Sequence, residues 1–269
     1  MTPTYEWIYV YLHRFLNLPN KTKVNNSKFR TLVITKADLT RLVAKCKSHN
    51  VKMTAFVNLA NALAIRMIYD KYMPHMAHTT ATQNIQYTTN VSLREFPEYK
   101  AYETIPPPEA TSDYSGGHDT IGCYIGLSFG SFRDPLRFRG DPNWMSDFWA
   151  LARRDSRDFH QRLDNGEFIH PIILPPKRKE RDEFFYHFGN SNLGVLPASA
   201  TSAKLIKIRQ AFATGRYSKE NFLCWYSNLI ATIDGQMCWT ISFNTYFIRQ
   251  EIIDCLIENL TKVIRELSR

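Results

Sequence analysis

The chain has 269 residues, of which 44% are hydrophobic, 13% aromatic and 22% charged. This composition excludes a disordered or collagen-like polypeptide, and the length allows one large domain with a substantial core. The formal net charge of +9 first suggests nucleic acid as a partner, but the basic residues are dispersed, and their densest cluster (KRKERDE, 177–183) is interleaved with acids. We therefore expect a solvated loop there and no nucleic-acid interface; attraction to an anionic ligand such as a CoA phosphate, or to an acidic partner surface, is the alternative.

The sequence shows no signal for a membrane or for export. No stretch approaches the roughly 20 apolar residues of a membrane span. Residues 1–16 are apolar-rich but have no basic leader and no small-residue cleavage site. The five cysteines are odd in number, far apart and without a Cys-x-x-Cys pair, which favours buried free thiols in a reducing compartment. We expect a cytoplasmic protein.

The first half of the chain alternates helices and strands. Apolar residues at helical spacing predict an amphipathic helix over 3–16, followed by a polar loop to residue 27. A strand over 29–35 comes next, then a helix that begins at 36–38 and ends near Ser48. A second helix is predicted from Thr54, as its cap, to Tyr72. Residues 85–93 alternate in polarity, as in a strand with one buried face.

The second half is richer in strands. A proline-rich loop over 97–117 leads to a predicted strand over 121–129 and a helix from about 143 to 163. Further strands are predicted over 192–196, 204–211, 222–233 and 236–246, with Asp234-Gly235 as a two-residue hairpin turn between the last two. An amphipathic helix over 249–267 ends the chain. This order predicts an α/β (α+β) fold with a mixed β-sheet covered by helices.

Patterns that carry chemistry are sparse. The sequence has no Gly-x-Ser-x-Gly elbow, no phosphate-binding glycine loop and no dinucleotide fingerprint. His75 and His78 are three residues apart, but no nearby Cys or carboxylate completes a metal site, so no metal is expected. His187 is a weak catalytic candidate because it precedes a strand whose start would face a central cleft. Structural packing of this histidine is the favoured alternative.

Six segments carry a resemblance through their order. They are the strand and helices over 29–64, ending in VKMTAFVNLANALA, then NVSLR (90–94), IGCYIG (121–126), DFWALAR (147–153), SNLG (191–194) and IDGQ (233–236). Together they resemble the second half of condensation domains and alcohol acetyltransferases, in the chloramphenicol acetyltransferase-like superfamily of CoA-dependent acyltransferases. The resemblance assigns residues 28–269 to a C-terminal acyltransferase-like domain. It assigns residues 1–27 to a leading helix and linker joined to a missing N-terminal half.

The resemblance also implies what the site should contain. Members of the superfamily have two such halves around a tunnel, and the first half supplies His-His-x-x-x-Asp-Gly, whose second histidine deprotonates the acceptor for attack on a thioester. This chain has no His-His pair. Arg94 matches the arginine that pairs with the aspartate of that motif. The other implied positions, which line the tunnel or hold its wall, are Asn90, Ser191, Asn192, Asp234 and Gly235.

Two functions are compatible with this resemblance. One is half of an acyltransferase that moves an acyl group from CoA or a carrier thioester to an alcohol or amine, with the thioester as co-substrate and no bound cofactor. The other is a non-catalytic truncated or degenerate relative that acts as a binding module. A lone half would expose the face that it buries against its partner, so we expect an apolar patch and a tendency to self-associate.

Overall fold

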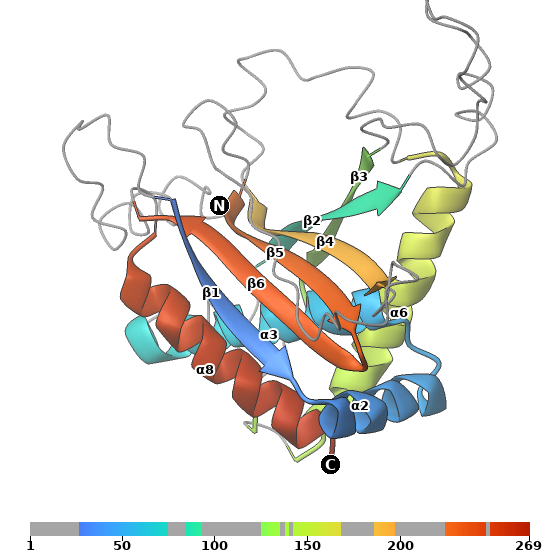
Figure 1. The fold of residues 1–269 in the computed structure, drawn as a ribbon, viewed down its shortest axis with the longest axis horizontal. Coiled ribbons are helices and arrows are strands. Elements are labelled where there is room, and N and C mark those ends of the chain that lie inside the picture. The colour runs from blue at the N-terminus through green and yellow to red at the C-terminus, as the bar shows by residue number, and fades with distance from the viewer. Residues whose placement is uncertain are drawn as a thin grey trace, which may run out of the picture.

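A computed structural model describes residues 27–74, 84–92, 125–134, 138–139, 142–167, 186–196, 224–245 and 248–269. Six strands and four helices lie in these ranges (Figure 1). In chain order they are β1 (Ser27–Ile34), α2 (Lys36–Ser48), α3 (Met53–Tyr72), β2 (Ile85–Ser92), β3 (Ile125–Phe132), α6 (Trp144–Asp164), β4 (Tyr186–Leu196), β5 (Cys224–Ile233), β6 (Gln236–Asn244) and α8 (Gln250–Leu267). The helix predicted over 3–16, the strand over 204–211 and Arg94 lie outside the described residues.

The strands form one mixed sheet in the order β1-β6-β5-β4-β2-β3. β4 runs parallel to both of its neighbours, β2 and β5, whereas the other three pairs are antiparallel. Because β2, β4 and β5 point the same way, their C-terminal ends meet at one edge of the sheet. The predicted mixed sheet is therefore confirmed.

The helices pack against one face of this sheet (Figure 1). Arg30 of β1 forms an ion pair of 2.8 Å with Asp254 of α8, and Asn190 of β4 donates a hydrogen bond to Asn58 of α3. α3 packs against the sheet with α6 on one side and α8 on the other, so nearly its whole circumference is buried. This position explains why residues 55–65 carry no charged side chain on any side of the helix. We call the opposite surface of the sheet the outer face.

Several element boundaries differ from the prediction by a few residues. β4 begins at Tyr186, six residues before the predicted start, because pairing with β5 from Cys224 onward extends it through Gly189 and Asn190; both residue types disfavour strands in isolation. β3 (Ile125–Phe132) ends at Phe132 and not at residue 129 as predicted, while the predicted start over 121–124 lies outside the described ranges. The cap of α3 is Lys52, so Thr54 lies within the first turn.

Individual residues determine the turn between β5 and β6 and the start of α2. Asp234 and Gly235 have φ values of 50° and 76°, the left-handed conformations that a type I′ hairpin turn requires, so the predicted hairpin between β5 and β6 is confirmed.

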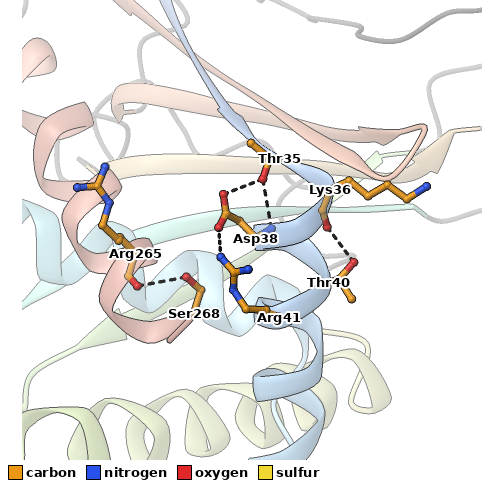
Figure 2. Close-up of polar contacts among 7 residues, drawn as sticks. All are labelled: Thr35, Lys36, Asp38, Thr40, Arg41, Arg265 and Ser268. Carbon is orange, nitrogen blue, oxygen red and sulfur yellow. Dashed lines mark hydrogen bonds and ion pairs between the residues drawn. The ribbon is translucent and has the colours of Figure 1, made fainter.

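Figure 2 shows the start of α2, where Thr35 Oγ1 accepts a hydrogen bond of 3.2 Å from the backbone N–H of Asp38. The Asp38 carboxylate in turn accepts from Thr35 and Arg41 (Figure 2). These bonds satisfy groups that a bare helix end would leave unpaired.

Gly130→Ala is expected to destabilise the protein by about 1–3 kcal/mol, the usual cost of overpacking a core. A Cβ at residue 130 would overlap the ring of Tyr87. That ring is fully buried between Phe132 and Phe188, at centroid distances of 5.2 and 5.5 Å, and cannot move away. Urea unfolding of the variant measures the loss. Adding Tyr87→Leu should make the two effects clearly non-additive, and strict additivity would contradict the proposed clash.

Candidate functional site

A chain of buried amides crosses the sheet beneath α3. Asn228 Nδ2 on β5 donates 2.7 Å to Asn190 Oδ1 on β4, and Asn190 Nδ2 donates to Asn58 Oδ1 on α3. All three residues are at most 2% exposed. Trp239 Nε1 on β6 closes one end of the chain with a bond of 2.8 Å to Asn228 Oδ1. Since unpaired polar groups are costly in a core, this pairing fixes the rotation of α3 on the sheet.

The other end of this network is the carboxyl group of Asp155 on α6. Asn58 Nδ2 donates 3.1 Å to one of its oxygens, and the Tyr87 hydroxyl on β2 donates to the other. Burial raises the pKa of Asp155 to about 6, and burial also raises the pKa of Tyr87 well above its usual value. The network therefore joins α3 and α6 to four strands through one buried carboxyl. Its members are Asn58, Tyr87, Asp155, Asn190, Asn228 and Trp239, together with Asn61 of α3, which accepts from Asn228 and from the Tyr226 hydroxyl.

Sequence reasoning did not identify this network. Asn58 lies within an apolar helix, and Asn228 lies between apolar residues of a strand. Each of these polar residues at a core position could have indicated a buried hydrogen bond. A polar side chain at a core position usually has a buried hydrogen-bond partner. Its partner cannot be named from the sequence, because Asn58 and Asp155 are 97 residues apart.

The network determines where Ser191 lies. Asn190 points toward α3, so the next residue of the strand, Ser191, points to the outer face. Thr89 of β2 pairs with Asn190, and this register places Asn90 beside Ser191 on the same face. Both side chains are half-buried and form no hydrogen bond within the described part of the chain. The structure thus brings together two of the predicted site residues.

Asn192 has a different environment. Its Oδ1 accepts 2.9 Å from the backbone N–H of Gly194, which has φ of 72°, and the pairing of β4 with β5 shifts register between Asn192 and Val195. This side chain therefore shapes the local turn at the end of β4. Asp234 and Gly235 follow β5 at the same edge of the sheet, where Leu196 pairs with Ile233. In the structure, Asp234 and Gly235 form the hairpin turn between β5 and β6.

His187 lies inside the fold near the start of β4. Its Nδ1 accepts 3.1 Å from the backbone N–H of Gln86, and its ring lies 4.6 Å from the indole of Trp225 between centroids. Burial lowers the pKa of His187 to about 4. The residue is 7% exposed, and its imidazole stays neutral and packed at physiological pH. This geometry is that of a histidine packed in the core.

Few large hydrophobic side chains are exposed in the described part of the chain. Among the described residues, the large hydrophobic side chains with the most exposure are Phe29, Val33, Met145, Leu193 and Val195. Within the same ranges, no three His, Cys, Asp or Glu side chains are grouped as metal ligands. No single described helix has the length and apolar composition of a membrane span; α2 and α3 together meet those criteria, with a bend of 103° between them.

Comparisons with known proteins identify the fold. No family model and no curated protein sequence match the chain. Among solved structures, it is similar to the trichothecene 15-O-acetyltransferase of Fusarium sporotrichioides, with a TM-score of 0.61 and 10% identity over 98% of this chain and 52% of that one. It is also similar to a condensation domain that mediates chain release from the enacyloxin polyketide synthase, with a TM-score of 0.55 and 12% identity over 97% of this chain and 46% of that one.

A third similar structure is the epimerization domain from the third module of tyrocidine synthetase B, with a TM-score of 0.54 and 10% identity over 96% of this chain and 54% of that one. The chain therefore spans about half the length of these structures. Its fold is the condensation-domain and chloramphenicol acetyltransferase-like acyltransferase fold, as the sequence predicted. At these identities the similarity is one of fold.

Proposed function

We propose that this chain forms one half of an acyltransferase, which transfers an acyl group from CoA or a carrier thioester to an alcohol or amine. The observation that carries the proposal is the fold match, which covers nearly all of this chain and about half of each acyltransferase or condensation domain. The catalytic histidine would come from the other half, in the same longer protein or in a partner chain, because the printed sequence has no His-His-x-x-x-Asp-Gly motif.

In this proposal the outer face near Asn90 and Ser191 is part of the tunnel wall. Their side chains are half-buried, polar and neighbouring, and they have no hydrogen-bond partner among the described residues. Such groups suit the orientation of a polar substrate at a largely apolar wall. The rigid amide network behind Asn190 would keep this part of the wall in place.

The test is release of free thiol from acetyl-CoA and longer acyl-CoAs with a panel of alcohols and amines. The chain is assayed alone and then with a co-purifying second chain that contains the histidine motif. We expect turnover only in the second case, with Ser191→Ala raising KM for the acceptor. A matched control is Ser48→Ala, at an exposed helix end. Turnover by this chain alone would overturn the proposal, and loss of that turnover in His187→Ala would transfer the chemistry to His187.

The second candidate function is a non-catalytic binding module. The absence of the histidine motif from the sequence and the burial of His187 favour it for the chain acting alone. In that case no second chain would restore turnover, while an acyl-CoA or acceptor would still bind in a saturable manner. Calorimetric titration of the same panel distinguishes this outcome from the half-enzyme.

A further inference from the structure

Four exposed cations gather where the turn between α2 and α3 meets α6. Lys45 lies in the last turn of α2, and Lys52 directly precedes α3. Arg153 and Arg157 lie one turn apart on α6. Arg153 Nε donates 2.9 Å to the backbone carbonyl of His49, which joins α6 to the end of α2, and Arg157 and Lys52 line one surface hollow. We call these four cations the basic surface.

The basic surface has no carboxylate partner within the described ranges. None of its four side chains forms an ion pair there, whereas the adjacent Arg154 pairs with Asp134. Asp164 is the one carboxylate among the residues that line the hollow beside Lys52 and Arg157. Like charges that lie close together repel one another, so binding of an acidic group would relieve this repulsion.

Helix stability does not explain why these charges are present. The helix dipole favours Lys45 near the C-terminal end of α2, but it disfavours Lys52 at the start of α3. Arg153 and Arg157 lie in the middle of α6, and as like charges four residues apart they destabilise that helix slightly. Cations that do not stabilise their own helices favour a role in binding.

Contacts within the fold hold the basic surface in place before a partner binds. The imidazole of His49 stacks on the indole of Trp149, with ring centroids 4.5 Å apart and an interplanar angle of 3°. The backbone N–H of Val51 donates 2.8 Å to the carbonyl of Cys46, which fixes the turn after α2. Because Arg153 is bonded to the same turn, little ordering of the backbone remains to be paid for on binding.

We propose that the basic surface binds an acidic segment of another protein. Guanidinium groups bind carboxylates in a bidentate manner, and cations spread over two helices and a turn fit an extended acidic chain better than one small anion. Trp149, the aromatic residue beside the surface, is 5% exposed and offers no platform for stacking bases. This inference does not depend on acyl transfer.

A membrane surface fits these residues less well than an acidic protein does. Of the large hydrophobic side chains that are most exposed in the described ranges, Met145 alone belongs to α6, and none belongs to α2 or α3. Peripheral membrane helices bury a broad apolar face in addition to their basic residues. The basic surface therefore has the charge for a lipid headgroup layer but not the apolar area.

The test measures binding of a fluorescein-labelled oligoglutamate peptide to the full chain by fluorescence anisotropy. We expect saturable binding at low ionic strength that weakens as salt is added. The double variant Lys52→Glu with Arg157→Glu should bind at least about tenfold more weakly, because two attractive contacts become repulsive. Both positions are exposed, and a glutamate at 52 suits the start of α3, so this variant should remain folded in thermal denaturation. Arg157→Gln, which removes one charge without reversing it, should give an intermediate affinity.

The matched control has the same change in net charge away from the basic surface. It combines Lys36→Glu with Lys262→Glu, at exposed positions on α2 and α8, and a glutamate at 36 likewise suits a helix start. We expect it to bind within about threefold of the wild type. Equal weakening in the two double variants would show that only net charge matters and would overturn the proposal, as would absence of saturable binding to the wild type. Tighter binding of an RNA duplex than of a peptide of equal charge would overturn it in favour of nucleic acid.

Discussion

Asn58→Ala is expected to lower the free energy of unfolding by about 3–5 kcal/mol. The side chain accepts a hydrogen bond from Asn190 and donates one to Asp155, and all three residues are buried. Truncation leaves an amide N–H and a carboxyl oxygen without partners in the core. The variant also creates a small cavity between α3 and β4, which adds to the loss.

Urea unfolding at neutral pH measures this effect, read as a shift of the midpoint at constant slope. Asn165→Ala is the matched control, because that asparagine is exposed and its amide bonds only to the nearby Glu167. We expect the control to stay within about 0.5 kcal/mol of the wild type. A loss below about 1 kcal/mol for Asn58→Ala would mean that the network does not hold α3 on the sheet.

The second large effect is a dependence of stability on pH that Asp155 causes. Its folded pKa of about 6 lies above the ordinary aspartate value of about 3.9, so folding favours the protonated carboxyl. This contribution is fully present below about pH 4 and is lost as pH rises through about 6. The raised pKa of Asp155 contributes of the order of 3 kcal/mol to the free energy of unfolding at low pH. Burial is the main cause, and the bonds from Tyr87 and Asn58 oppose it.

Asp155→Asn should remove this dependence, because the amide does not titrate. The quantity to compare is the change in unfolding free energy between pH 4 and pH 7 in wild type and variant. His187 has the opposite sign, since its lowered pKa of about 4 makes stability fall as pH drops below about 6.5. Because wild type and Asp155→Asn share this contribution of His187, it cancels when their changes in unfolding free energy are subtracted. Asp164→Asn, on the exposed side of the same helix, is the control, and equal slopes for wild type and Asp155→Asn would contradict the prediction.

The sequence was informative wherever one residue type or one period determines local geometry. The alternation along β6 placed Met237, Trp239 and Phe243 on the core side, and Asp234-Gly235 specified the hairpin. The order of six short segments indicated the fold that the structural comparisons then showed. By contrast, the start of β4 was missed because local propensity near Gly189 and Asn190 opposes a strand, and pairing with β2 on one side and β5 on the other overcomes it.

The site could be predicted only in part. Asn90 and Ser191 were identified from motifs, but their position side by side on the outer face depends on the parallel register of β2 and β4. Their role in a tunnel remains a proposal. The amide network was not predicted, because it joins residues about 100 positions apart along the chain.

The sequence by itself determined the helices, most strands, the tight turn and the class of fold, because periodicity, turn chemistry and segment order act over short distances. The tertiary structure alone decided which polar side chains are buried together and that His187 is enclosed. These properties arise from contacts between distant segments, and the same residue types would have a different pKa, partner or exposure in another packing.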